Sequence, residues 1–131
     1  MILYHGTHKE AAESILDHGL KRGSYVANST AEACQYGRVI FKVKIAVVDL
    51  DIPWDVDEVM EDWWKWHFIE EPQILDAIEN QHKDPWEFVL KQTRGNRGRA
   101  SLRIAGWAVT TVPVYPWDLR IIETLEDSTY E

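Results

Sequence analysis

The sequence predicts a single α+β domain, and three observations support this prediction. The chain has 131 residues, a length typical of one domain. Strand-like patterns near both ends flank a helical middle, an order typical of an α+β fold with a helical insertion. The hydrophobic content is 45%, which is enough to bury a core, and no apolar run approaches the ~20 residues of a membrane-spanning helix. We expect a soluble domain over residues 1–131, with an acidic, Trp-rich helical insertion at about 50–99.

The first elements alternate between strand and helix. Residues 2–4 predict a short strand, and residues 8–18 predict a helix because apolar side chains recur on one face. Thr7 is the predicted N-cap, with Glu10 three residues later completing a capping box. Gly19 is expected to end this helix, because glycine adopts the left-handed conformation at that position.

A second strand and a second helix are predicted next. Residues 25–27 predict a strand, and either Ser29 or Thr30 is expected to cap a short helix that ends near Tyr36. Residues 39–48 are the most regular strand candidate in the chain, because apolar residues alternate with lysines.

The middle of the chain, residues 55–92, is predicted to be helical. It is broken at Pro72 and Pro85, and proline is tolerated in the first turn of a helix. Residues 101–112 and 119–125 predict two closing strands.

Charge is unevenly distributed along the chain. The formal net charge is −8, which disfavours binding to bulk nucleic acid. Residues 49–62 carry acids and no lysine or arginine, whereas residues 94–103 carry arginines and no acid. Trp63, Trp64 and Trp66 point in different directions on a helix, so at least one is expected to be partly exposed.

The cysteine and histidine content indicates a metal-free protein of a reducing compartment. Cys34 is the single cysteine, which excludes an internal disulfide and a multi-cysteine zinc site and fits a cytoplasmic protein. We expect Cys34 to be a small buried residue rather than a nucleophile. No signal peptide pattern is visible at the start, and the histidines lack metal-ligand spacing.

Three N-terminal motifs resemble those of a known family. The motifs are LYHGT at residues 3–7, YVAN at 25–28 and ACQY at 33–36. Together they resemble the NAD-binding half of the ADP-ribosyltransferase superfamily, in its diphtheria-toxin and poly-ADP-ribose-polymerase branch with a His–Tyr–Glu signature. Tyr25 and Tyr36 are eleven residues apart, the spacing expected from that branch. The resemblance covers about residues 1–48, is weak over 100–125 and is absent over 50–99.

The resemblance implies a split β-sheet core of two small facing sheets, with NAD in the cleft and the helical insertion as a lid. His5, Tyr25 and Tyr36 would be the catalytic residues: His5 would hydrogen-bond the adenosine ribose and the tyrosines would hold the nicotinamide ring. Gly6, which lacks a Cβ, would permit close approach of backbone to the carboxamide. The residues implied in NAD binding are His5, Gly6, Thr7, Tyr25, Asn28, Ser29 and Tyr36, and the arginine-rich segment adds Arg97 as a pyrophosphate ligand.

The sequence departs from the family at one position. The family usually places a Glu at the start of a late strand, where it binds the ribose 2′-hydroxyl, whereas Gly106 or Ala108 stands there in this chain. Some family members that lack this Glu still transfer a single ADP-ribose. An acid from the insertion, either Glu70, Glu71 or Glu87, is an alternative source of the carboxylate.

The sequence thus predicts a small NAD-dependent mono-ADP-ribosyltransferase, of a size that suits a toxin or phage effector, acting on a protein or small-molecule acceptor. NAD is expected as a substrate, with no metal and no membrane partner. One alternative is a catalytically inactive module of the same fold that binds NAD, another nucleotide or a protein. A second is an RNA 2′-phosphotransferase-like enzyme, which the arginines of 94–103 permit and the acidic balance opposes.

Overall fold

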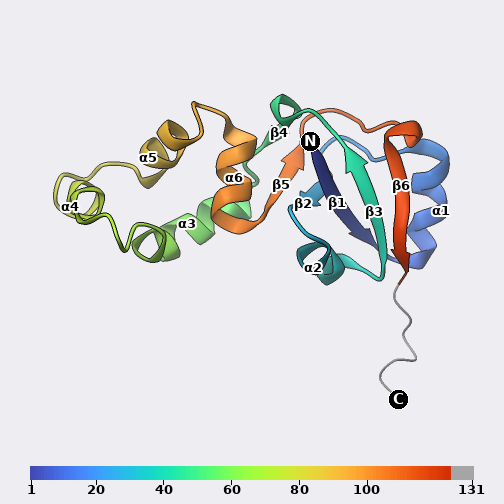
Figure 1. Cartoon of the computed structure of the whole chain (residues 1–131), viewed down its shortest axis with the longest axis horizontal. Coiled ribbons are helices and arrows are strands. Elements are labelled where there is room, and N and C mark those ends of the chain that lie inside the picture. Colours follow the sequence, from blue (N-terminus) through green and yellow to red (C-terminus); the bar gives the residue numbers. More distant parts are fainter. Residues whose placement is uncertain (125–131) are drawn as a thin grey trace, which may run out of the picture.

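A computed structural model describes residues 1–124, in which a six-stranded antiparallel sheet adjoins an arm of helices (Figure 1). The strand order in the sheet is β4-β5-β2-β1-β3-β6. The strands are β1 (Ile2–Thr7), β2 (Tyr25–Ala27), β3 (Val39–Lys44), β4 (Leu50–Asp51), β5 (Trp107–Thr110) and β6 (Leu119–Thr124). The helices are α1 (Lys9–His18), α2 (Thr30–Ala33), α3 (Trp54–His67), α4 (Pro72–Asn80), α5 (Pro85–Gln92) and α6 (Arg97–Ala105), and a 3₁₀ helix, η1 (Cys34–Tyr36), extends α2. The fold class is therefore α+β, as predicted.

Within residues 1–124, buried hydrophobic residues form two large cores and a small cluster of Ala27, Ala33 and Ile40. The larger core lies on the sheet and includes Leu3, Phe41 and Val43, with α1 contributing Ala12. The second core lies within the arm formed by α3, α4, α5 and α6, and its buried residues are Met60, Phe68, Ile78, Val89 and Ala100. Helix α6 contributes Ala100 to the arm's core and Leu102 to the core of the sheet, so it joins the two halves.

Most of the predicted elements are confirmed. Helix α1 spans Lys9–His18 and ends at Gly19, whose φ is 80°. Ser29 caps α2, because its side chain accepts a hydrogen bond from the Glu32 N–H. Pro72 and Pro85 stand in the first turns of α4 and α5.

The predicted capping box of α1 is wrong. Thr7 is the last residue of β1, where it pairs with Val39 and is buried, so it is not available as a cap. The N-cap position is His8, and it makes no side-chain capping hydrogen bond.

Two strand predictions are too long. The strand predicted at 39–48 ends at Lys44, and the chain then turns through Val47–Asp49 into the short strand β4. The first part of the strand predicted at 101–112 is helix, because α6 continues to Ala105. Helix α6 starts after Asn96, whose side chain accepts from the Arg99 N–H, and it ends at Gly106 in the left-handed conformation. Only Trp107–Thr110 is strand. The last predicted strand is confirmed over Leu119–Thr124, and residue 125 lies outside the described residues.

The expected pair of facing sheets is also not observed, because β1 joins the two halves into one sheet. Strand β1 pairs with β2 on one side and with β3 along its full length on the other, from Ile2↔Lys44 to Thr7↔Val39.

Two expectations about single side chains have opposite outcomes. Trp63 and Trp66 are 59% and 66% exposed whereas Trp64 packs into the arm's core, so the expected exposure of a tryptophan is confirmed. Cys34 is exposed rather than buried, and it belongs to η1, in which no residue is buried. Within residues 1–124, no helix has the length and apolarity needed to span a membrane.

Candidate functional site

The two tyrosines predicted from the sequence to bind NAD, Tyr25 and Tyr36, lie against each other. Tyr25 begins β2 and Tyr36 ends η1, and their rings stack with centroids 5.9 Å apart and an interplanar angle of 21°. A third ring between them would need about 7 Å, twice the ~3.5 Å of a carbon–carbon contact. The rings therefore have to separate before a nicotinamide can enter.

Helix α2 positions Tyr36 by packing directly on the backbone of β1. A Cβ built on Gly6 would lie 1.8 Å from the Ala33 carbonyl oxygen, so only glycine permits this approach. A Cβ on Gly37 would lie 2.2 Å from the Thr7 backbone. In this structure Gly6 and Thr7 therefore hold α2 and η1 in place, and their contact with a cofactor stays a prediction.

His5 forms a hydrogen bond that defines its tautomer. Its Nδ1 lies 2.6 Å from the Tyr25 carbonyl oxygen. A carbonyl can only accept, so Nδ1 carries the proton and Nε2 of the neutral ring is an acceptor. Burial lowers the pKa of His5 below its ordinary 6.5, and the hydrogen bond to Tyr25 opposes this shift in part. At neutral pH His5 therefore offers an acceptor that suits a sugar hydroxyl.

The acid beside the tyrosines is Asp55, in the first turn of α3. The Tyr25 hydroxyl donates to Asp55 Oδ1 at 3.4 Å. Burial, followed by the charge of Asp55, raises the pKa of both Tyr25 and Tyr36, so both phenols stay protonated at neutral pH.

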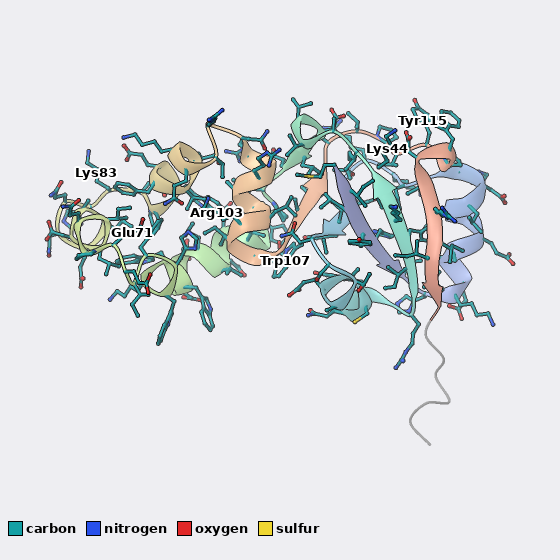
Figure 2. The ribbon with its side chains drawn as sticks, in the orientation of Figure 1. Lys44, Glu71, Lys83, Arg103, Trp107 and Tyr115 are labelled. Carbon is teal, nitrogen blue, oxygen red and sulfur yellow. The ribbon has the colours of Figure 1, made fainter. Side chains whose placement is uncertain are left out.

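Asp55 is not among the site residues predicted from the sequence, although it belongs to the acidic segment 49–62. The acids suggested from the sequence, Glu70, Glu71 and Glu87, all lie in the helical arm. Figure 2 shows Glu71 in that arm, well separated from Trp107 at the start of β5.

The late strand carries no acid at either expected position. Ala108 is fully buried opposite Val26, and Gly106 has a φ of 88° that disfavours any other residue. The space beside Gly106 holds a different side chain: a Cβ built there would lie 3.5 Å from Cγ and 3.8 Å from Oε1 of Glu32.

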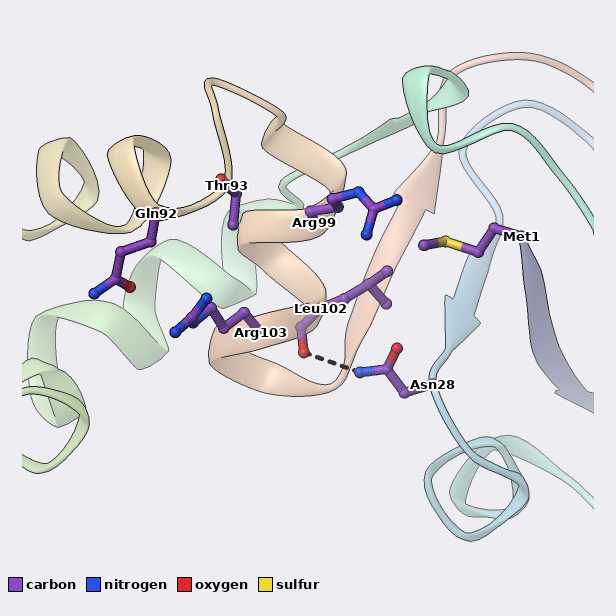
Figure 3. A pocket seen from close by; sticks show the side chains of 7 residues that line it. All are labelled: Met1, Asn28, Gln92, Thr93, Arg99, Leu102 and Arg103. Carbon is purple, nitrogen blue, oxygen red and sulfur yellow. Dashed lines mark hydrogen bonds between the residues drawn. The ribbon is translucent and has the colours of Figure 1, made fainter.

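Arginines of α6 line a cavity of about 350 Å³ next to Asn28 (Figure 3). The Asn28 side-chain amide donates to the Leu102 carbonyl oxygen at 3.1 Å, which fixes the end of β2 against α6. The lining residues are Met1, Asn28, Gln92, Thr93, Arg99, Leu102 and Arg103. A neighbouring cavity of about 470 Å³ is lined by Gln92, Thr93, Arg94, Asn96 and Arg99.

Arg97, the arginine selected from the sequence, is not among the residues that line these two cavities. Its Nε donates to Asp51 Oδ1 at 2.6 Å and ties α6 to β4. Burial raises the pKa of Asp51, but the hydrogen bonds from Arg97 and from the Ile52 N–H, together with the charge of Arg97, bring it below the ordinary 3.8. The structure therefore brings Arg99 and Arg103, rather than Arg97, to the cavity beside Asn28.

Ser29 uses its hydroxyl oxygen for the cap of α2, so its predicted contact with a dinucleotide also stays a prediction. Within residues 1–124, no group of three or more His, Cys, Asp or Glu side chains is arranged to hold a metal ion.

Comparisons of the chain with protein-family models, with curated proteins and with solved structures found no match. The class that the coordinates define is an α+β protein with one antiparallel sheet. Its candidate site combines a stacked tyrosine pair, a neutral histidine and two nearby carboxylates, those of Asp55 and Glu32.

Proposed function

We propose that this protein is a cytoplasmic mono-ADP-ribosyltransferase that uses NAD as its substrate and modifies a protein or small-molecule acceptor. The observation that carries the proposal is the stacked pair of Tyr25 and Tyr36, contributed by the two motifs that resemble the family. Aromatic faces hold a flat ring by offset stacking, and each such pair contributes ~0.5–1.5 kcal/mol beyond burial.

His5 supports the same ligand. Its Nε2 is an acceptor for a ribose hydroxyl, because Nδ1 is committed to the Tyr25 carbonyl. The bond to Tyr25 also couples the histidine to β2, the strand that carries one of the two tyrosines. One dinucleotide can therefore contact both groups.

The cavity beside Asn28 supports a pyrophosphate subsite. Asn28 follows Tyr25 by three residues, about 10 Å along an extended chain, and a ribose with its phosphate bridges a comparable length. Arg99 and Arg103 line this cavity, and a guanidinium binds phosphate oxygens in a bidentate way. We assign the pyrophosphate contact to these two residues in place of Arg97.

A catalytically inactive binding module is the second candidate. The observation that favours it is β5 itself, where Gly106 and Ala108 supply no acid. An RNA 2′-phosphotransferase-like enzyme is the third, favoured by the arginine-lined cavities and opposed by the net charge of −8.

The proposal is tested by the effect of NAD on thermal unfolding. A ligand that binds only the native state stabilises it by about 2.7 kcal/mol at a hundred times its Kd. NAD is expected to raise the Tm of the wild type, and His5→Ala and Tyr36→Ala are expected to lose most of that shift.

Two surface variants, His18→Ala and Tyr115→Ala, serve as matched controls and should keep the full shift, because both residues lie outside the site. No shift at millimolar NAD, or site variants that respond like the controls, would contradict the NAD proposal.

A further inference from the structure

Transfer of ADP-ribose generates positive charge on a sugar carbon, and that charge is best stabilised by a nearby carboxylate. Strand β5 supplies none. We propose that Glu32 of α2 supplies it, with its carboxylate placed against Gly106 at the start of β5. The inference rests on the proposed function and adds to it the residue that makes the site catalytic.

The geometry around Gly106 carries this assignment. A side chain on residue 106 would begin 3.5 Å from Glu32 Cγ, 3.6 Å from its Cδ and 3.8 Å from its Oε1. The Glu32 carboxylate thus occupies the space next to the missing side chain, reached from α2 instead of from β5. Gly106, which links α6 to β5, is fixed against the end of β2, since its carbonyl accepts from the Asn28 N–H at 2.9 Å.

Glu32 lies on the short helix that leads to Tyr36. Its backbone N–H is capped by Ser29, and its Oε2 accepts from Gln35 Nε2 at 3.4 Å. Helix α2 continues into the 3₁₀ helix that ends at Tyr36. The negative charge of Glu32 contributes to the raised pKa of Tyr36, after burial and the charge of Asp55, which is consistent with this proximity.

Asp55 is the other carboxylate near the tyrosines. Its Oδ1 accepts from the Tyr25 hydroxyl. It also lies in the first turn of α3, where the positive end of the helix dipole stabilises an acid. Glu32 likewise accepts one hydrogen bond, from Gln35, and lies in the first turn of its own helix, so these interactions do not separate the two acids. The choice of Glu32 rests on its position beside Gly106, whereas Asp55 lies at the hydroxyl of Tyr25.

The step conserves atoms and electrons without a redox partner. The bond between ribose C1′ and the nicotinamide nitrogen breaks, and its electron pair leaves with nicotinamide, which changes from a cationic pyridinium to a neutral pyridine. C1′ then takes an electron pair from an oxygen of the acceptor or of water, whose proton passes to solvent. The Glu32 carboxylate accepts a hydrogen bond from the ribose 2′-hydroxyl and stabilises the positive charge.

The experiment separates binding from turnover in the full chain. NAD binding is measured by the Tm shift, and turnover by nicotinamide release from NAD with water as acceptor and by label transfer from NAD into a cell lysate. Glu32→Gln is expected to keep the Tm shift and to lose turnover by ~10²–10³-fold, as when one transition-state contact is removed. Glu32→Asp keeps the charge on a side chain that is shorter by one methylene. Its turnover is expected to lie between that of the wild type and that of Glu32→Gln.

Glu13→Gln, an exposed acid of α1, is the matched control and should turn over like the wild type. Turnover in Glu32→Gln equal to that of the wild type, or loss of turnover in Asp55→Asn alone, overturns the assignment. A wild type that binds NAD without releasing nicotinamide or labelling an acceptor also overturns it, while leaving the binding proposal intact. Absence of any NAD-dependent Tm shift is instead a failure of the proposed function.

Discussion

At His5, burial and a hydrogen bond act on one imidazole in opposite directions. Burial lowers the pKa, and donation from Nδ1 to the Tyr25 carbonyl raises it, with a net pKa below 6.5. Between the folded and unfolded values the unfolded chain binds more protons. The free energy of unfolding therefore rises with pH through the window just below 6.5 and levels off above it.

His67 contributes in the same direction. Burial and the charge of Arg103 lower its pKa, against the charge of Glu71 and a hydrogen bond with Gln92. We expect His5→Gln to reduce, without abolishing, the dependence of unfolding free energy on pH below 6.5, since His67 remains. Urea titrations of both proteins at several pH values measure this. An unchanged slope in His5→Gln would show that His5 is not buried as the structure has it.

At the scale of elements, helix α2 contains Glu32 and continues into the 3₁₀ helix that ends at Tyr36. We therefore expect the N-cap of α2 to affect the positions of both residues. Removing a side-chain N-cap typically costs 0.5–2 kcal/mol. Ser29→Ala and Asp84→Ala, which removes the cap of α5, are both expected to lower the unfolding free energy by about this amount. Only Ser29→Ala is expected to reduce the NAD-dependent Tm shift as well.

Ser29→Asp distinguishes a cap from a direct contact with NAD, because aspartate is an equally good N-cap. It should restore the shift if Ser29 acts through α2. Equal loss of the shift in Ser29→Ala and Asp84→Ala would contradict the special role of α2.

Elements with strong local signals were predictable, and those defined by distant partners were not. Proline at the first turns of α4 and α5 places their starts from the sequence alone. Residues 97–105 have too few apolar side chains for a clear helical period, and the helix there depends on the Asn96 cap and on packing between two cores.

The same distinction holds for the site. The family resemblance implied that Tyr25 and Tyr36 hold one nicotinamide ring between them, and in the structure the two rings stack directly on each other. The approach of Asp55 to Tyr25 and of Glu32 to Gly106 depends on contacts between residues 30 and 74 positions apart in sequence, respectively. Hydrophobic periodicity carries no information on such pairs.

At the scale of the whole molecule, the sheet and the helical arm meet at the site. Helix α6 belongs to both cores and lines the cavity beside Asn28, while α3 brings Asp55 to the tyrosines. Figure 1 shows the arm of helices beside the sheet. The arm supplies charged groups to a site whose two tyrosines lie at the start of β2 and at the end of η1. The sheet is continuous rather than split, and the neighbouring strands β1 and β2 still place His5 and Tyr25 side by side.

A crystal structure of the protein with bound NAD tests the central claim most directly. We predict the nicotinamide ring between Tyr25 and Tyr36, with their centroids separated from 5.9 Å to about 7 Å, and the Glu32 carboxylate on the ribose 2′-hydroxyl. NAD bound elsewhere, with the two tyrosines still stacked on each other, would contradict the account.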